Sequence, residues 1–204
     1  MLETFGVNTY IDGIPYHGKT DIAILRAAVQ RCGISDRIFD ERVQDAIGVV
    51  CREVAAHSTE IVAEACLGIP ELVATLHTSD RLVGTASGNL EAVGWRKVAA
   101  AGLRSFFDMG SFGDKFERRT QIFEQAKTMA RARCGSRATI CFFGDTPDDI
   151  HAARAIDAQI VAVATGTYAL EVLARESPDA CLKSCADLSC ADLSGAIFSP
   201  RPKR

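Results

Sequence analysis

The sequence lacks any long hydrophobic run, and it lacks an excess of basic residues. No stretch approaches the roughly 18 consecutive apolar residues of a membrane-spanning helix. The start, MLETFGVNTYIDG, has no basic region followed by an apolar one, as a secretory signal would have. With a formal net charge of −3, the 204 residues offer no positive surface for nucleic acid or an anionic membrane. We therefore predict a cytoplasmic protein with no nucleic-acid partner and no membrane partner.

A disulfide framework is not indicated either, although the chain has eight cysteines. In a chain of this length without a signal sequence, reduced thiols are expected. Cys181, Cys185 and Cys190 cluster near the end, but they lack the spacing and the neighbouring histidine that are typical of zinc sites. We interpret them as buried or incidental thiols, with zinc as the alternative.

The sequence does contain the pattern of one α/β core with a smaller appended domain. Between Thr20 and about His77, apolar residues recur every three to four positions, which predicts helices. From Arg81 onward, helical patterns alternate with the short apolar runs RLVGTAS, LRSFFDMG, ATICFFG, AQIVAVA and ACL. This alternation predicts βαβ units and a mostly parallel sheet flanked by helices. Ligands of such sheets bind beyond the carboxyl ends of the strands.

The first strand end carries a small polar turn. Ser87, Gly88 and Asn89 follow RLVGTAS and open a helix that is predicted to run from Asn89 to about Ala101. A hydroxyl group and free N–H groups at a helix N-terminus suit a phosphate or a carboxylate. The alternative is that Ser87 merely caps the helix.

A second strand end is acidic. Asp145 and Asp149 follow the run ATICFFG about one helical turn apart, so both can face one point. Two carboxylates beside a phosphate are what Mg²⁺ prefers. A plain helix start, with Pro147 early and acidic residues at the positive end, explains Asp148 and part of Asp149. It does not explain Asp145, for which we favour a functional role.

Three segments carry these features together: VGTASGNLEAVGWRKVAAAGL, FFDMGSFGDKFERR and FFGDTPDDIHAARAIDAQIVAVATG. They resemble the haloacid dehalogenase superfamily, in particular its phosphoglycolate-phosphatase-like branch, and GKTDIAIL is similar to the opening of that branch's helical cap. The resemblance implies a Rossmannoid core over residues 81–198 and an all-helical cap over 14–80. Residues 1–13 would be the remnant of a first helix or linker, and 199–204 a tail. It also implies a Mg²⁺-dependent phosphatase that acts on a small phosphorylated metabolite.

The resemblance further implies roles for the residues of both turns. Ser87 would bind the transferring phosphoryl group, helped by the amides of Gly88 and Asn89. Asp145 and Asp149 would hold the Mg²⁺.

A basic residue ahead of the acidic turn would neutralise charge on the phosphoryl group. Arg119 matches this role best, and its rivals are Arg118, Lys115 and Lys97. A plain alternative for Lys97 is a solvated side chain on the helix after Ser87. The predicted catalytic residues are thus Ser87, Arg119 and Asp145.

One motif of the superfamily is absent from this sequence. Its chemistry starts from Asp-x-Asp-Gly-Thr after the first core strand, where the first Asp attacks phosphorus and the second acts as acid and base. No Asp-x-Asp occurs in the 204 residues, and the nearest string, YIDGIP, would put Tyr10 in place of the nucleophile. We therefore expect that the first core strand and the nucleophile are missing through truncation at the N-terminus. The strands that end at Ser87 and Gly144 would then have unpaired edges, and the chain as given would be inactive. The alternative is a non-catalytic remnant that binds metal, an anion or a partner chain.

Overall fold

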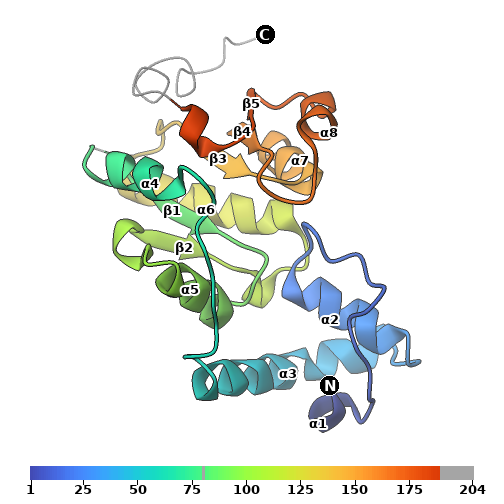
Figure 1. Ribbon diagram of the computed structural model, residues 1–204. Coiled ribbons are helices and arrows are strands. Elements are labelled where there is room, and N and C mark those ends of the chain that lie inside the picture. Colours follow the sequence, from blue (N-terminus) through green and yellow to red (C-terminus); the bar gives the residue numbers. More distant parts are fainter. Residues whose placement is uncertain (80, 189–204) are drawn as a thin grey trace.

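The protein has an α/β fold, described here by a computed structural model for residues 1–79 and 81–188 (Figure 1). The helices are α1 (Leu2–Phe5), α2 (Asp21–Gln30), α3 (Asp36–Ala56), α4 (Ile69–His77), α5 (Glu91–Ala100), α6 (Arg119–Cys134), α7 (Pro147–Ala155) and α8 (Leu170–Arg175). The strands are β1 (Gly84–Ala86), β2 (Met109–Ser111), β3 (Cys141–Gly144), β4 (Gln159–Val163) and β5 (Ala180–Leu182). Short 3₁₀ turns are η1 (Arg104–Phe106), η2 (Gly113–Lys115) and η3 (Cys185–Asp187). The predicted tail 199–204 and Cys190 of the alternative zinc site lie outside the described residues.

The strands form two parallel sheets. β1 pairs with β2, and β3, β4 and β5 pair in that order. This confirms the predicted α/β class with short parallel strands between helices. Among residues 1–79 and 81–188, β1 has no ladder partner other than β2, and β3 has none other than β4. The edges of β1 and β3 are therefore not hydrogen-bonded to each other.

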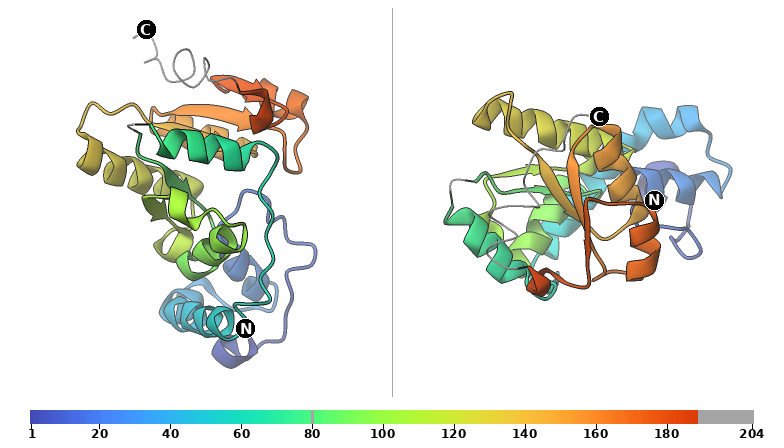
Figure 2. Two further views of the ribbon diagram at one scale, coloured as in Figure 1. Left: turned by 60° about the vertical axis from the view of Figure 1, so that its left-hand side comes forward. Right: turned by 90° about the horizontal axis from the view of Figure 1, so that it is seen from above.

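The middle strand of the second sheet, β4, is buried on both faces. All five residues of β4 are buried, which is typical of a central parallel strand. Ile160 on one face packs in a cluster with Phe123 of α6, while Val161 on the other face packs with Leu72 of α4. Figure 2 shows the three strands side by side with α4 along the sheet.

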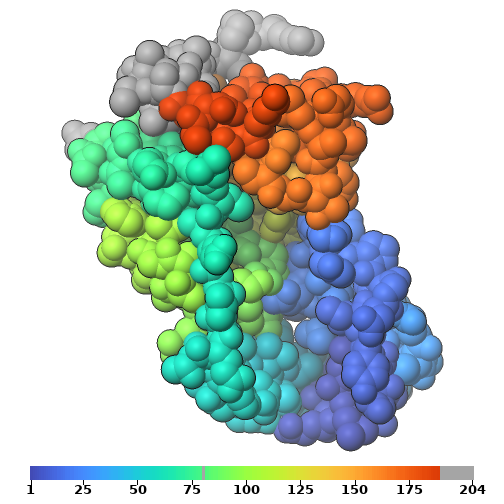
Figure 3. Space-filling view, in the orientation of Figure 1, coloured from blue at the N-terminus to red at the C-terminus, as the bar shows by residue number. Residues whose placement is uncertain are grey.

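The helices α1, α2 and α3 form a separate group with its own apolar cluster. Phe5 and Phe39 stack with ring centroids 5.6 Å apart, and Val29 and Leu90 belong to the same buried cluster. A chain segment without regular structure connects α3 to α4, and it crosses the face of the molecule shown in Figure 3. α4 thus lies within residues 14–80 but packs against the second sheet rather than against α2 and α3.

One predicted strand is shifted along the chain. The run LRSFFDMG does not form a strand throughout, since residues 104–106 form the turn η1 and the strand begins at Met109. The reason is that the Arg104 guanidinium lies 3.9 Å from the centre of the Trp95 ring and donates to the Phe107 carbonyl oxygen at 3.1 Å, which closes a turn. Within the described part of the chain, no helix combines the length and the apolar character that crossing a membrane requires.

Candidate functional site

The serine turn directly follows β1. The Ser87 hydroxyl oxygen accepts a hydrogen bond from the Asn89 N–H at 3.2 Å. α5 begins at Glu91 with Leu90 as its N-cap residue, so the interpretation of Ser87 as the helix cap is wrong. Of the two amides that the sequence predicts for anion binding, the Asn89 amide therefore already has a partner within the turn.

A carboxylate from a distant element holds this turn from outside. One Asp21 oxygen accepts from the Leu90 N–H at 2.8 Å, and the other accepts from the Asn89 side-chain amide at 3.0 Å. Gly88 lies so close to the same segment that an added Cβ would be 2.6 Å from the Lys19 carbonyl oxygen. No larger residue fits at Gly88 without moving one of the two backbones.

The acidic turn is closed by its own residues. Asp149 is almost fully buried, and its Oδ2 accepts from the Thr146 N–H at 3.2 Å and from the Thr146 hydroxyl at 2.8 Å. The Thr146 hydroxyl in turn accepts from the Asp149 N–H at 3.2 Å, which completes a capping box at the start of α7. Oδ1 of Asp149 accepts from Arg119 Nε at 2.7 Å. Both carboxylate oxygens of Asp149 are thus engaged.

Asp145, directly after β3, differs from Asp149 in its burial and in its contacts. It is half-buried, and among the described residues its carboxylate takes part in no ion pair. An added Cβ on Gly166 would lie 1.9 Å from Oδ2 of Asp145, so only glycine leaves room for this carboxylate. Burial raises the pKa of the Asp145 carboxyl above its usual range, and the negative charge of Asp149 raises it further. A hydrogen bond from its own backbone, followed by the positive charges of Arg119 and His17, opposes this effect without cancelling it.

The structure brings one of the four basic candidates to the acidic turn. Arg119 begins α6, and its side chain is mostly buried in the ion pair with Asp149. Lys97 lies at the serine turn instead, where its Nζ donates to Oδ1 of Asn89 at 3.1 Å. Arg118 and Lys115 are exposed.

The loop before α2 links the two turns. The Lys19 ammonium pairs with the Asp148 carboxylate at 2.7 Å, and an added Cβ on Gly18 would lie 3.0 Å from that carboxylate. Lys19 and Thr20, which directly follow Gly18, contact Gly88. Because three extended residues span at most roughly 10 Å, the serine and acidic turns lie near one another. Sequence reasoning did not identify Lys19 or Asp21 as part of this region, although both stand in the string GKTD that marked the start of the predicted cap.

Whether these residues suit Mg²⁺ depends on which carboxylates are available. Asp145 fits, since it is a hard oxygen ligand without an ion-pair partner and lies beside a second negative charge. Asp149 fits only if it exchanges its contact with Arg119. Within residues 1–79 and 81–188, no group of three or more His, Cys, Asp and Glu side chains is arranged to hold a metal. Asp145 and Asp149 would therefore supply two carboxylate ligands, and water and a substrate phosphate would complete the coordination.

The string YIDGIP ends three residues before Gly18, but its Asp12 makes its contact near the other end of α2. The Asp12 carbonyl oxygen accepts from Arg31 at 2.6 Å, and Arg31 follows the last residue of α2. The loop that contacts the acidic turn lies at the start of α2, whereas Arg31 lies at its end. A ten-residue helix is about 15 Å long. Tyr10 is 69% exposed. The position of this string gives no support for a divergent catalytic loop.

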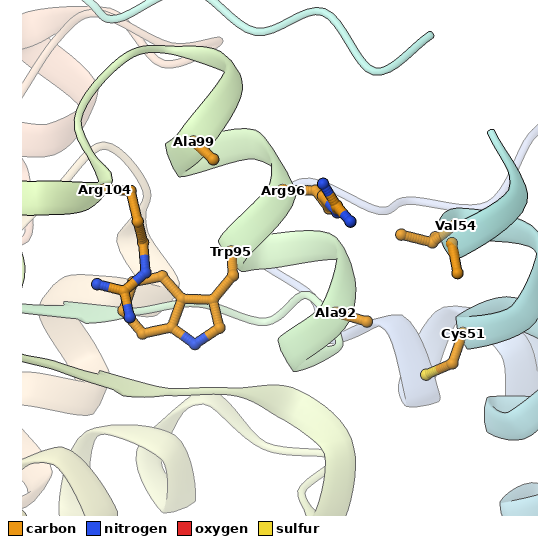
Figure 4. Close-up of a pocket in the computed structure, with 8 residues that line it drawn as sticks. Cys51, Val54, Ala92, Trp95, Arg96, Ala99 and Arg104 are labelled. Atoms are coloured by element: carbon orange, nitrogen blue, oxygen red, sulfur yellow. The ribbon is translucent and has the colours of Figure 1, made fainter. Parts of the chain in front are cut away.

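A separate apolar cavity of about 360 Å³ lies between α3 and α5 (Figure 4). Cys51 and Val54 line it from α3, and Trp95 and Arg96 line it from α5. None of the site residues predicted from the sequence contributes to this cavity.

Comparison with solved structures shows the same fold in several proteins. A haloacid dehalogenase-like family hydrolase from Streptococcus pneumoniae is similar with a TM-score of 0.57 and 16% identity, over 91% of this chain and 83% of that chain. A predicted phosphoglycolate phosphatase from Haemophilus somnus 129pt gives a TM-score of 0.53 and 15% identity, over 80% and 72%. CbbY from Rhodobacter sphaeroides, in complex with phosphate, gives 0.53 and 18%, over 71% and 65%.

Sequence comparisons place the chain in a family. A comparison with curated proteins gave no match. The family described as haloacid dehalogenase-like hydrolase matches residues 24–163, which is more than half of the 204 residues. The chain therefore belongs to the haloacid dehalogenase-like hydrolases.

Proposed function

We propose that this chain carries the metal-binding and phosphate-binding part of a Mg²⁺-dependent phosphatase site for a small phosphorylated metabolite, and that the aspartate nucleophile is not among its residues. The observation that carries the proposal is the meeting of Arg119, Asp145 and Asp149 at the carboxyl end of β3, close to the serine turn after β1. Ligands of parallel α/β sheets bind at this edge.

Each residue has a role that its contacts support. Asp145 offers the metal a carboxylate that takes part in no ion pair among the described residues, and Asp149 offers a second one when Arg119 turns to the phosphoryl group. Ser87 and the Gly88 amide bind a phosphoryl oxygen at the opposite strand end. The ion, when bound, neutralises charge on the phosphate. These groups alone bind the ground state, and binding of that kind does not raise the turnover rate.

Within residues 1–79 and 81–188, β1 and β3 each have one edge without a strand partner, which supports the proposal that one strand of the site is missing. A parallel strand between them would pair with both edges, at about 4.8 Å from each. An acidic residue at the carboxyl end of such a strand would lie between the serine and acidic turns, where an in-line nucleophile is needed. We propose that a segment outside residues 1–204 supplies this strand.

The helices α2 and α3 act as the cap in this proposal. They form a cluster of their own and contact the rest of the molecule through residues such as Leu90 and Val93. Because α4 packs on the second sheet, we propose that the cap ends within the segment between α3 and α4, before residue 80. A cap of this kind excludes water from the site when it closes. The cytoplasmic location stays a prediction.

A Mg²⁺ titration tests the metal assignment. In the presence of inorganic phosphate, the parent should bind Mg²⁺ and Asp145→Asn should bind it at least about tenfold more weakly, since the free charged ligand is lost. Glu41→Gln is the control, because Glu41 is an exposed carboxylate that pairs with Arg37 within α3. Equal Mg²⁺ affinity of the parent and Asp145→Asn in calorimetry would contradict the assignment.

A second titration tests the phosphate assignment. Ser87→Ala and Arg119→Lys should both weaken the binding of inorganic phosphate, whereas Arg37→Ala should not, because Arg37 is exposed and pairs with Glu41 within α3. If phosphate binds all variants alike, the two turns do not form the anion site.

Activity separates the truncated enzyme from its alternative. The 204-residue chain should not hydrolyse an aryl phosphate above background with Mg²⁺, whereas a chain extended by an in-frame upstream segment with Asp-x-Asp-Gly should. If the upstream DNA encodes no such segment, the alternative of a non-catalytic binding remnant is favoured. Activity of the 204-residue chain that is abolished by Tyr10→Phe or Asp12→Asn would overturn the proposal of a missing nucleophile.

A further inference from the structure

The segment between α3 and α4 touches the last described turn of the chain. Gly68 has a φ of +83°, and an added Cβ there would lie 2.1 Å from the Ala186 nitrogen and 2.4 Å from the Cys185 carbonyl carbon. Only glycine allows this backbone approach. The Ile69 N–H donates to the Cys66 carbonyl oxygen at 3.0 Å, which folds residues 66–69 into a tight turn. Cys66 is therefore held two residues away from a backbone contact with Cys185.

The two cysteines at this contact differ in exposure. Cys66 is exposed, whereas Cys185 is only 4% exposed and packs in the apolar cluster with Leu72 and Val161. Burial raises the pKa of the Cys185 thiol to about 11, and the charge of the Cys66 sulfur acts in the same direction. A charge effect between the two sulfurs agrees with the backbone contact in placing them near each other. Both thiols are free in this structure.

We propose that Cys66 and Cys185 form a dithiol that closes to a disulfide and pins the α3–α4 segment to η3. The oxidant is a low-molecular-weight disulfide. The Cys66 thiolate attacks one sulfur of this oxidant and releases one thiol, which leaves a mixed disulfide on Cys66. Cys185 then attacks the Cys66 sulfur, and its proton passes to the departing thiolate, which leaves as the second thiol. Two thiols of the protein are oxidised, and one small disulfide is reduced to two small thiols.

The order of these steps follows from exposure. Cys66 reaches a small oxidant in solvent, and Cys185 reaches only its neighbour, so Cys185 can resolve the mixed disulfide but not start the reaction. Cys181 lies on the other face of the second sheet, where its thiol contacts the Leu170 carbonyl oxygen at 3.7 Å. The pairing does not rest on the proposed phosphatase function.

Peptide mapping tests the pairing in the full chain. The protein is equilibrated with oxidised glutathione, alkylated and digested with trypsin, which releases Cys66 in fragment 53–81 and Cys185 in fragment 184–203. The expected result is one cross-link between these fragments in the parent and in the control Cys134→Ser, whose mutated thiol is exposed. Cys66→Ser and Cys185→Ser should both lack it.

Two outcomes would overturn the pairing. One is a stable glutathione adduct on Cys66 without a cross-link. The other is a cross-link that persists in Cys185→Ser, which would identify Cys190, in the same fragment, as the partner. A chain oxidised in urea serves as the reference, since an unfolded chain should scatter its disulfides over the eight cysteines.

Proteolysis tests the pinning itself. Glu60 and Glu64 are exposed in the α3–α4 segment, and a glutamate-specific protease should cut there at least about threefold more slowly after oxidation of the parent. The rate for Cys66→Ser should not change on oxidation. Equal rates for the reduced and oxidised parent would show that the disulfide pins nothing.

Discussion

The two turns at the strand ends are held in different ways. The acidic turn after β3 is closed by its own residues, since Thr146 and Asp149 cap each other and one nearby arginine neutralises the charge. The serine turn after β1 depends on Asp21, which comes from another helix far away in the sequence. The acidic turn is thus largely a local structure, whereas the serine turn takes part of its hydrogen bonding from α2.

A second contrast lies inside the acidic turn. Asp149 is buried, and both of its carboxylate oxygens have hydrogen-bond partners, whereas Asp145 is half-buried, and its pKa is raised because its charge is only partly compensated. The Asp149 carboxylate therefore stabilises the fold, whereas the charged Asp145 carboxylate destabilises it. A carboxylate with a perturbed pKa, such as that of Asp145, is the stronger candidate for a functional residue.

The largest effect is expected from Asp149→Ala. The variant loses the partner of a mostly buried arginine and half of the capping box, so the free energy of unfolding should fall by about 3 kcal/mol. Urea denaturation of the parent and the variant measures this. Asp149→Asn keeps an acceptor for Thr146 but not the charge, and it should lose less. A loss below about 0.5 kcal/mol in Asp149→Ala would contradict the structural role.

Asp21→Ala should have a smaller effect and should act on the other turn. It removes two hydrogen bonds from a partly exposed carboxylate, so the free energy of unfolding should fall by about 1–2 kcal/mol. Amide hydrogen exchange should rise at Leu90, whose N–H loses its acceptor, and stay unchanged at Thr146. Faster exchange in both turns would show that they are not held independently.

Much of the fold could be predicted from the sequence because its signals are local. The alternation of apolar runs and helices after Arg81 predicted the parallel strands. Thr146 and Asp149 also stand at the spacing of a capping box, a local signal that could have identified the buried state of Asp149.

The features that sequence reasoning missed depend on contacts between distant residues. Asp21 lies 69 residues from Leu90, and Lys19 lies 129 residues from Asp148. Periodicity describes which face of an element is apolar but not which partner covers it. For the same reason α4 was grouped with the helices before it, although its apolar face packs against β4.

The state of Asp145 should be visible in the pH dependence of stability. Because its pKa is raised on folding, the folded chain binds this proton more tightly than the unfolded chain does. The protonated Asp145 therefore contributes to the free energy of unfolding at low pH. This contribution is lost as the pH rises from the ordinary pKa of about 3.9 through the raised pKa of the folded chain, and it is absent at higher pH. Asp145→Asn should thus be more stable than the parent at neutral pH, and the advantage should shrink as the solution becomes more acidic. Urea midpoints at a series of pH values measure this, and an advantage that grew toward acid would contradict the raised pKa.

The smallest effect on stability is expected from Lys19→Ala. Lys19 and Asp148 are both substantially exposed, so their ion pair should contribute less than about 1 kcal/mol, and high salt should abolish the contribution. This variant also loosens a contact between two parts of the site. Among the described residues, Lys19 makes the one ion pair between the loop before α2 and the acidic turn. If the two turns cooperate in phosphate binding, Lys19→Ala should weaken the binding of inorganic phosphate more than its small effect on stability accounts for, and Arg37→Ala, which removes an exposed ion pair within α3, should not. Equal phosphate binding by both variants would indicate that the serine and acidic turns act separately.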